Sequence, residues 1–530
     1  ENDFESIAVG VESMPKFSFL FALVMTLSML TVGMVALSYT GYRALCKIQL
    51  GFLKKFTWKK KVFIFSELNE SALLLGTDIK LQHKDGIVIY CVPGIEEEEE
   101  QLELEKEAAQ KGFFVIPMQN ELHRELFSLC KHFSKKKLYL FFISKDEIDN
   151  ISACSDFSEF CKTKKNHLPR INTYLWVQGS DYASMLSAQE YSSMELHIID
   201  ENELAVRNLF SEITPNAYGD DDYLKIYILG WNKIAENLIK YLVSLGQVQN
   251  RRLKIVLLEE NIVDKSAIFF NQNVQIGQVS DFVFIEKIEN SKDYFDYLNQ
   301  EFPNIDMLFY LNQDLRSLAE LFRIKTRLAS EAKLCCYFSN KNQYKELLGK
   351  TDFFQIQFFG NWKELYTDAL IIDEKLDVLA KGFHQYYGKL YEDTRKWEDI
   401  SLFEQQSNRA LALSIQSKLY GIGLYYDIGD SVELFESKIK DTKILMKLTI
   451  EEHIRWNAFY FCNGWRTLTV DKNNLKNKNA KTKEHVCLVS FDELVTVGEA
   501  FEKDFQEMDQ HLVLHMGKIL QQAGFGVYAR

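Results

Sequence analysis

The stretch LKIYILGWNKIAENLIKYL, residues 224–242, decides the fold of this 530-residue chain. It begins with an apolar run that is rich in β-branched and aromatic residues, and Gly230 ends that run. From Ile234 onward the apolar residues recur at helical spacing. A strand, a glycine turn and a helix in this order form the opening unit of a doubly wound α/β domain.

Further apolar runs follow this unit along the chain. The set is LKIYILG (224–230), LKIVLLE (253–259), FVFIEKI (282–288), DMLFYL (306–311), KLCCYFS (333–339) and FQIQFFG (354–360). Segments with helical spacing, notably Ile234–Leu245 and Leu315–Ser330, separate the runs. Runs that are apolar on both faces and alternate with helices are typical of a parallel sheet covered on both sides. We therefore expect a Rossmann-like domain at 220–375.

A similar set of apolar runs lies earlier in the chain. It comprises VFIFS (62–66), IVIYCV (87–92), FFVIPM (113–118), LYLFFIS (138–144) and TYLWVQ (173–178). Helical spacing is visible between them, at Ser71–Leu81 and Glu103–Gln110. The sequence therefore predicts a first Rossmann-like domain at 62–215, and the fold class is α/β with two such domains in tandem.

The glycine turn of the second domain resembles a dinucleotide-binding turn only in part. A G-x-G-x-x-G motif lets the backbone approach a pyrophosphate at a helix N-terminus. Here Asn232 and Ala235 replace the second and third glycines, and Glu259 stands where a ribose-binding acid is expected. The cofactor-binding candidates are Gly230, Asn232 and Glu259. The cofactor itself is left open, with a nucleotide-type ligand and NAD as the two candidates. The alternative is an ordinary tight turn between a strand and a helix.

The run IYILGWNKIAENLIKYL resembles the start of a TrkA-N domain, the RCK-type cytoplasmic module that regulates potassium channels and transporters. This resemblance implies tandem Rossmann units that hang by a basic linker from a membrane helix. It also implies assembly of the chain with copies of itself into a ring, as a homo-oligomer and specifically a tetramer. Asn232 departs from the glycine pattern of the family. This departure argues against NAD binding and does not affect the expected fold.

Residues 17–42, FSFLFALVMTLSMLTVGMVALSYTGY, carry no charged side chain. A helix of this length is about 39 Å long, at about 1.5 Å per residue, and can cross a hydrocarbon layer of ~30 Å. Arg43 and six lysines up to Lys61 follow it, which places the carboxy-terminal side in the cytoplasm. We expect a transmembrane helix in the inner cell membrane, with the lipid bilayer as a partner. The alternatives are a buried soluble helix and an uncleaved signal peptide.

The expected membrane helix also determines how we interpret the segments before and after it. Residues 1–16 form either an extracellular tail or a re-entrant pore loop, and they lack the TVGYG filter of potassium channels. Residues 43–61 form the basic linker to the cytoplasmic domains.

Composition excludes several classes of function. The net charge of −13 argues against nucleic acid as a partner. The nine cysteines form no C-x-x-C pair and no cluster with histidine, so we expect neither disulfides nor a metal site. No catalytic set is visible, and we expect a protein that is not an enzyme.

The last part of the chain, 376–530, reads as mainly α-helical. Glu452, His453, Arg455 and Trp456 fall within about one helical turn. An arginine can pair with a phosphate and a tryptophan can stack on a base, so this group can hold an anionic aromatic ligand such as a nucleotide. The alternative is a structural helix whose tryptophan and histidine pack in a core and whose arginine pairs with a glutamate.

These residues carry a second resemblance. SNRALALSIQSKLYGIG (407–423), EEHIRWNAFYFCNGW (451–465) and EHVCLVSFDEL (484–494) look like the RyR domain, a module named for ryanodine receptors and also found in bacterial proteins that contain TrkA-N domains. The resemblance implies a nucleotide-type signal as ligand, in anti-phage systems. The ligand-binding candidates are Asn408, Arg409, Glu452, His453, Arg455, Trp456, Asn457 and Trp465. We expect one final helix over Val497–Ala523.

Together these features predict a membrane ion-channel subunit or membrane effector that is gated by a cytoplasmic nucleotide-type signal. The signal would bind the RyR-like domain or its seam with the second Rossmann-like domain. The alternative is a membrane-anchored sensor or scaffold without a pore. We reject an NAD-dependent enzyme, because the glycine motif is degraded.

Overall fold

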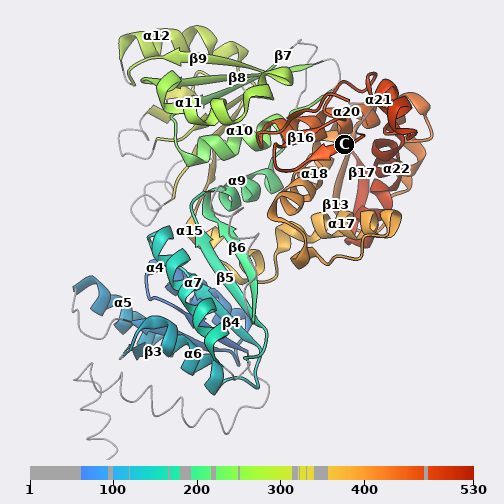
Figure 1. The fold of residues 1–530 in the computed structure, drawn as a ribbon. Helices are drawn as coiled ribbons and strands as arrows, with labels where there is room; N and C mark the ends of the chain where they lie inside the picture. The colour runs from blue at the N-terminus through green and yellow to red at the C-terminus, as the bar shows by residue number, and fades with distance from the viewer. Residues whose placement is uncertain are drawn as a thin grey trace, which may run out of the picture. The chain divides into compact units, whose positions relative to one another are not determined.

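A computed structural model describes residues 61–92, 99–118, 120–164, 168–179, 193–215, 223–248, 251–289, 291–312, 320–321, 323–329, 331–339, 356–470 and 475–530 (Figure 1). By its internal contacts the chain divides into two compact units. The first ends at Leu175 and includes Tyr191–His197, and the second holds the rest. Each unit is described by itself below.

The first sheet has six strands in the order β3-β2-β1-β4-β5-β6. Its strands are β1 (Val62–Phe65), β2 (Ile87–Val92), β3 (Phe114–Pro117), β4 (Leu138–Phe142), β5 (Ile171–Val177) and β6 (Met194–Asp200). The strands alternate with the helices α4 (Glu70–Gln82), α5 (Glu99–Gln110), α6 (Leu122–His132) and α7 (Glu147–Thr163), and α9 (Glu201–Glu212), which follows β6, belongs to the second unit. β1 pairs in parallel with both β2 and β4. This strand order is that of a doubly wound Rossmann-like fold.

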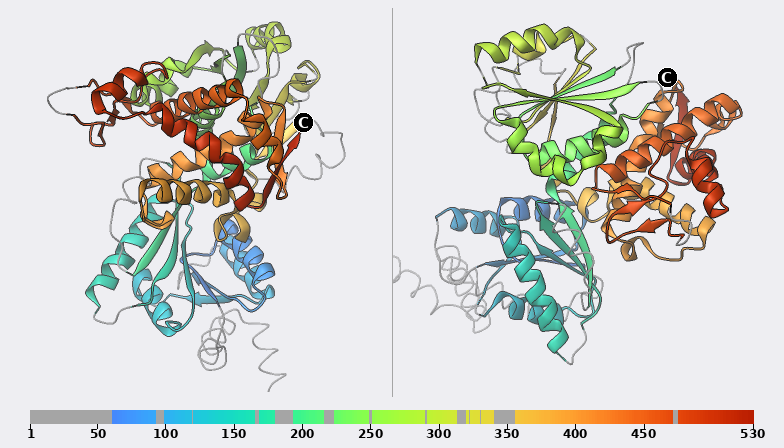
Figure 2. Two further views of the ribbon diagram at one scale, coloured as in Figure 1. Left: turned by 90° about the vertical axis from the view of Figure 1, so that its right-hand side faces the viewer. Right: turned by 45° about the horizontal axis from the view of Figure 1, so that its top comes forward.

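The second sheet repeats that order, as β12-β11-β10-β7-β8-β9, and all its neighbouring strands are parallel. The strands are β7 (Tyr223–Leu229), β8 (Arg252–Glu259), β9 (Ser280–Glu286), β10 (Met307–Tyr310), β11 (Lys333–Tyr337) and β12 (Ile356–Phe359). They alternate with α10 (Lys233–Leu245), α11 (Ile262–Gln272), the 3-10 helices η1 (Val274–Gln278) and η2 (Phe302–Asn304), and α12 (Lys292–Glu301). Helices cover both faces of this sheet, with α12 on one and α10 on the other (Figure 2).

Two Rossmann-like sheets were predicted from the apolar runs, and the structure confirms them. Each predicted run contains a strand of the structure within a few residues. Strand β6 was not predicted from the sequence, because its stretch MELHIID carries Glu195 and His197 and its central residues are only half-buried. An edge strand is partly exposed, so it lacks the continuous apolar run by which the others were recognised. Most of the predicted helix Leu315–Ser330 lies outside the described residues.

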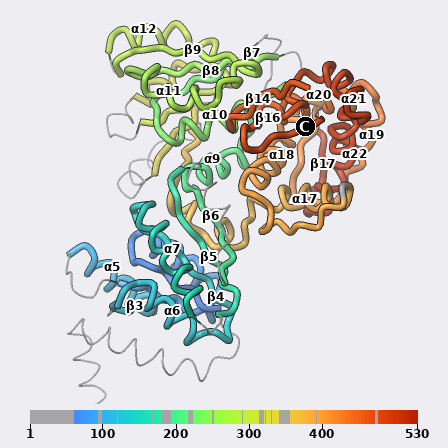
Figure 3. The backbone as a smooth tube through the Cα atoms, viewed as in Figure 1, coloured from blue at the N-terminus to red at the C-terminus, as the bar shows by residue number. Residues whose placement is uncertain are grey.

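The C-terminal region is mainly helical, as predicted, and belongs to the same compact unit as the second sheet. Its helices are α15 (Trp362–Leu365), α16 (Asp368–Ile371), η3 (Lys375–Asp377), α17 (Val378–Tyr391), η4 (Trp397–Asp399), α18 (Leu402–Tyr420), α19 (Glu433–Lys438), α20 (Thr442–Phe461), α21 (Leu494–Phe501) and α22 (Gln506–Gln522). The tube in Figure 3 follows α17, α18, α20 and α22 around one another. Their shared core includes Phe383, Ile415 and Met516.

Short strands complete this region. They are β13 (Leu424–Ile428), β14 (Arg466–Thr467), β15 (Lys478–Asn479), β16 (Glu484–His485) and β17 (Phe525–Ala529). β13 and β17 form an antiparallel pair, so the last residues of the chain are fixed against the end of α18.

The single final helix predicted over Val497–Ala523 is wrong, because the structure has α21 and α22 there. Glu502 adopts a left-handed backbone conformation with φ 52°, and the amide of Lys503 donates to the carbonyl of Gly498. This arrangement ends α21 and turns the chain. Apolar periodicity continues across the turn, so it did not reveal the break.

The expected membrane helix at 17–42, the pore loop or tail at 1–16 and nearly all of the linker at 43–61 lie outside the described residues. Among the helices that the structure describes, none combines the length and the apolarity that crossing a bilayer requires.

Candidate ligand pocket of the C-terminal region

Helix α20 forms the centre of the candidate site. It starts after Asp441, whose carboxylate accepts a hydrogen bond from the amide of Lys443 at 2.8 Å and so caps the helix. Polar and charged side chains along its second half are buried, namely Glu451, Glu452, His453, Arg455 and Asn457. Buried charges require partners, so these residues mark either a structural network or a binding site.

A pocket of about 740 Å³ lies beside this helix. Residues from α17, α18, α20, α21 and α22 and from the loops between them line it. The contribution of α20 is Glu452, His453, Arg455, Trp456 and Tyr460. The volume is typical of sites that bury a small-molecule ligand.

Glu452 and Arg455 form a bidentate ion pair on the pocket wall. Arg455 Nε lies 2.9 Å and Nη2 2.8 Å from the two carboxylate oxygens, and Lys418 Nζ lies 2.8 Å from Oε2 of the same carboxylate. Burial disfavours the ionised form of Glu452, but the two cations lower its pKa. The pair is therefore charged, and it uses two of the three guanidinium nitrogens of Arg455.

The third guanidinium nitrogen, Nη1 of Arg455, is buried and has no hydrogen-bond partner among the described residues. The residue as a whole is only 2% exposed. Although burial disfavours a charged guanidinium, Glu452 raises the pKa of Arg455 and the group stays cationic. A buried donor without an acceptor costs free energy, and an acceptor on a ligand would recover it.

His453 is held in a fixed orientation. Its Nε2 lies 2.8 Å from the carbonyl oxygen of Val489, which can only accept, so Nε2 carries a proton. Its Nδ1 lies 3.1 Å from Oδ2 of Asp509 on α22. Burial raises the pKa of Asp509, against the lowering effect of His453. The pair therefore joins α20 to α22 and forms one side of the pocket.

Aromatic rings form the apolar part of the wall. Trp456 is half-buried, and its ring centre lies 4.3 Å from that of Tyr460 and 5.1 Å from that of His485. Burial, with a smaller contribution from Lys478, lowers the pKa of His485 to about 4, so this imidazole is neutral at pH 7. Its Nδ1 accepts a hydrogen bond from the amide of Cys487 at 3.1 Å. A neutral aromatic surface of this kind can stack on a planar ligand.

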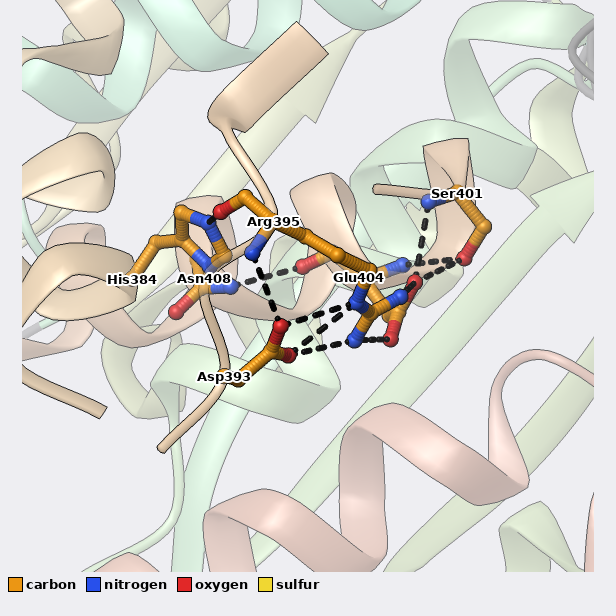
Figure 4. A network of polar contacts seen from close by, with 6 residues as sticks. All are labelled: His384, Asp393, Arg395, Ser401, Glu404 and Asn408. Carbon is orange, nitrogen blue, oxygen red and sulfur yellow. Dashed lines mark hydrogen bonds and ion pairs between the residues drawn. The ribbon is translucent and has the colours of Figure 1, made fainter. Parts of the chain in front are cut away.

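A second network borders the pocket at the start of α18 (Figure 4). Arg395 pairs with Asp393 through Nη2, at 2.6 Å, and with Glu404 through Nη2, at 2.9 Å. Glu404 also accepts from the amide and the hydroxyl of Ser401, at 2.9 and 2.8 Å, which completes a capping box. The carbonyl of Arg395 accepts from His384 at 2.8 Å. The network therefore fixes the loop between α17 and α18 beside the pocket.

Asn408 and Arg409 are neighbours in sequence but lie on different sides of α18. Asn408 lines the pocket and donates to the carbonyl of Glu404 at 2.9 Å. Arg409 is buried away from the pocket, where its Nη2 lies 2.7 Å from Oδ2 of Asp377. Arg207 of α9 bonds the same carboxylate. Together these two arginines lower the pKa of Asp377 to about 2, although its burial acts in the opposite direction.

This charged cluster joins three parts of the second unit. Glu203 of α9 accepts from Tyr241 of α10 at 2.8 Å and from Gln406 of α18 at 2.9 Å. We call Glu203, Arg207, Tyr241, Asp377, Gln406 and Arg409 the junction cluster. Because α18 carries pocket residues on one side and junction residues on another, it connects the pocket to the helices of the Rossmann-like fold.

Of the ligand-binding candidates, the structure brings Asn408, Glu452, His453, Arg455 and Trp456 to the pocket. It does not bring Arg409, Asn457 or Trp465 there. The amide nitrogen of Asn457 donates to the carbonyl of Val489 at 2.7 Å, and Trp465 packs on Phe403 in a core cluster.

Several lining residues were not predicted from the sequence, among them Asp393, Arg395, Tyr460, His485 and Asp509. Asp509 is 56 residues from His453, and no local spacing points to that pairing. His485 and Tyr460 stood within the segments that resemble the RyR domain, so the quoted motifs held a signal for them.

Two of the cofactor candidates, Gly230 and Asn232, form a compact turn at the carboxyl end of β7, and the third, Glu259, is the last residue of β8. Gly230 has φ +97°, and a Cβ there would lie 2.6 Å from Oδ1 of Asn312, so glycine is required. The side chain of Asn232 accepts from the amide of Ala235 at 3.2 Å and caps α10. Glu259 pairs with Lys265 at 2.8 Å. Asn232 and Glu259 thus already have partners within the chain.

Among the described residues, no group of three or more histidine, cysteine, aspartate or glutamate side chains could hold a metal ion.

No protein-family model matches this chain, and no curated protein matches it. Among solved structures it is similar to the GsuK channel, with 12% identity over 70% of this chain and 87% of that chain and a TM-score of 0.40. It is also similar to Anabaena Alr3699/HepE in complex with UDP and glucose, with 9% identity over 66% and 94% and a TM-score of 0.19. At such TM-scores these similarities carry no functional argument.

Proposed function

We propose that this chain is a ligand-responsive regulatory protein whose C-terminal pocket receives a nucleotide-type small molecule. The observation that supports this most is Nη1 of Arg455, a buried guanidinium donor without a partner among the described residues, on the wall of a 740 Å³ pocket. A structural arginine in a packed core normally has its donors satisfied. Arg207 and Arg251 also have buried guanidinium nitrogens without a partner among the described residues, but of these three arginines Arg455 is the one that lines the pocket. A site prepared for an acceptor on a ligand accounts for the unpaired donor of Arg455.

The other lining groups suit the same class of ligand. Trp456 offers a half-buried ring on which a base can stack. Ser407 and Asn408 add polar atoms from α18 on the same pocket. The resemblance of this region to the RyR domain led us to expect a nucleotide-type signal and a role in anti-phage defence. We include both expectations in this proposal.

Signal transmission would pass along α18 to the junction cluster. A ligand that contacts Asn408 acts one residue away from Arg409, whose carboxylate partner also binds Arg207 of α9. Binding changes the arrangement of the Rossmann-like fold only if the ligand prefers one arrangement over the other. The junction cluster is the physical connection through which that preference would act.

Binding of nucleosides and nucleotides to the purified full chain, measured by isothermal titration calorimetry, tests the proposal. Trp456→Ala should weaken binding, because it removes the stacking surface. Trp231→Ala is the matched control, since Trp231 is also half-buried but lies in the glycine turn against Phe269 and Phe270. Equal loss in both variants, or none in Trp456→Ala, would refute the pocket as the site.

A second candidate function is a membrane effector or channel subunit that the ligand gates. The uncharged stretch 17–42 and the basic residues after it favour this function. It requires assembly into a homo-oligomer, such as a tetramer, because a single helix makes no pore. Ligand-dependent ion flux through liposomes that contain the full chain would support it. Ligand binding without flux would favour the alternative, a membrane-anchored sensor without a pore.

A further inference from the structure

The charge of the pocket wall limits which ligands can bind. Carboxylates outnumber cations among the lining side chains. The lining carboxylates are Asp393, Glu404, Glu452, Asp504, Glu507 and Asp509, and the lining cations are Arg395, Arg455 and Lys503. Of the four lining histidines, His384, His453, His485 and His511, His485 is neutral at pH 7 because burial lowers its pKa to about 4.

Most of that positive charge is already engaged. Arg395 is held between Asp393 and Glu404, with its Nε 3.0 Å from Asp393 Oδ1 and its Nη1 3.2 Å from Glu404 Oε2. Hydrogen bonds from Arg395 lower the pKa of Asp393 to about 2, so this carboxylate is ionised at pH 7. Two nitrogens of Arg455 face Glu452. Nη1 of Arg455 and the exposed Lys503 remain for an anion.

The carboxylates of the pocket also determine which ligand groups can lie next to them. An ionised carboxylate only accepts hydrogen bonds, so a ligand group beside it has to donate. Exocyclic amino groups of a base and the hydroxyls of a ribose are donors, whereas phosphate oxygens are acceptors. Each additional phosphate would therefore meet repulsion without a further buried cation to offset it.

We infer that the pocket takes a nucleoside-type ligand with no more than one phosphate and discriminates against polyphosphates. The base stacks on Trp456 and directs its amino group toward the carboxylates, and the single anionic group approaches Arg455. This inference rests on the proposed function, because it concerns the ligand of the same pocket.

A charge series tests the inference. Adenosine, its 5′-monophosphate and its triphosphate, and the same guanosine series, would be titrated into the full chain without magnesium at fixed ionic strength. We expect the nucleoside or the monophosphate to bind at least about tenfold more tightly than the triphosphate, because several carboxylates repel the added charge. Tightest binding of a triphosphate that Trp456→Ala abolishes would overturn the inference and leave the proposed function standing. Absence of binding across both series would contradict the proposed function itself.

A variant that removes one negative charge tests whether the pocket carboxylates cause the discrimination against the triphosphate. Asp393→Asn keeps an acceptor for Arg395 but removes one negative charge from the pocket, so discrimination against the triphosphate should fall by about twofold. Glu436→Gln is the matched control, because Glu436 is exposed on α19 and does not line the pocket. Discrimination that Asp393→Asn leaves unchanged, or that Glu436→Gln changes equally, would count against the electrostatic explanation.

Discussion

The chain has two places that suggested nucleotide binding, the glycine turn at β7–α10 and the pocket wall at α20, and they differ in what is left unpaired. At the turn, Asn232 caps α10, and Glu259, the cofactor candidate at the end of the neighbouring strand β8, is paired with Lys265 of α11. At α20, Arg455 keeps one buried donor without a partner among the described residues. A binding site needs groups that the protein itself leaves unsatisfied, so the second place is the better candidate.

The two ion pairs at these places should differ most in their effect on stability. Arg455→Met leaves Glu452 buried with Lys418 as its remaining cation, and we expect a loss of about 3 kcal/mol in the free energy of unfolding. Lys265→Met breaks a pair whose lysine side chain is 45% exposed, and the loss should stay below about 1 kcal/mol. Urea unfolding of both variants measures this. Similar losses of unfolding free energy in the two variants would contradict the expectation that the buried pair contributes more to stability than the surface pair.

The two tryptophans should differ in their effect on binding. Trp456→Ala should weaken binding of a nucleoside monophosphate by about tenfold or more, because stacking on one base contributes about 1–3 kcal/mol. Trp231→Ala should leave the dissociation constant unchanged. Calorimetric titration measures both constants, and Trp456→Phe should restore part of the loss since a ring remains. A larger effect from Trp231→Ala would move the site to the turn.

The helix cap at the turn predicts a smaller effect on stability. Asn232→Ala removes the acceptor for the amide of Ala235 and should cost about 1 kcal/mol, whereas Asn232→Gly should cost only a few tenths. Thermal unfolding compares the two variants. Equal stability of wild type and Asn232→Ala would show that this side chain does not cap α10. The N-terminus of α10 would then be available to bind a phosphate group, and the turn would again be a candidate site.

The pocket, but not the turn, contains a histidine with a shifted pKa. The folded-state pKa of His485 is about 4, below its ordinary 6.5, so the unfolded chain binds more protons between these values. Stability should therefore decrease as the pH falls from about 6.5 to about 4. His485→Asn keeps an acceptor for the amide of Cys487 and should make that slope shallower. An unchanged slope would show that His485 does not lower stability in this range.

The sequence alone predicted the parts of the fold and of the pocket that depend on residues close together in the chain, and it did not predict contacts between distant residues. The strands of both sheets are continuous apolar runs, so local pattern located them, whereas β6 is a half-buried strand and escaped notice. Arg455 and Trp456 were found because they share one helix. The pairing of His453 with Asp509, and of Arg409 with Asp377, joins distant segments. No local spacing could tell that Asn408 lines the pocket while Arg409 belongs to the junction cluster.

A cryo-EM structure of the full chain with a bound nucleoside monophosphate tests the central claim most directly. The account predicts ligand density in the C-terminal pocket, with the base on Trp456 and an acceptor about 3 Å from Nη1 of Arg455. Density at Gly230 and Asn232, with the C-terminal pocket empty, would contradict it.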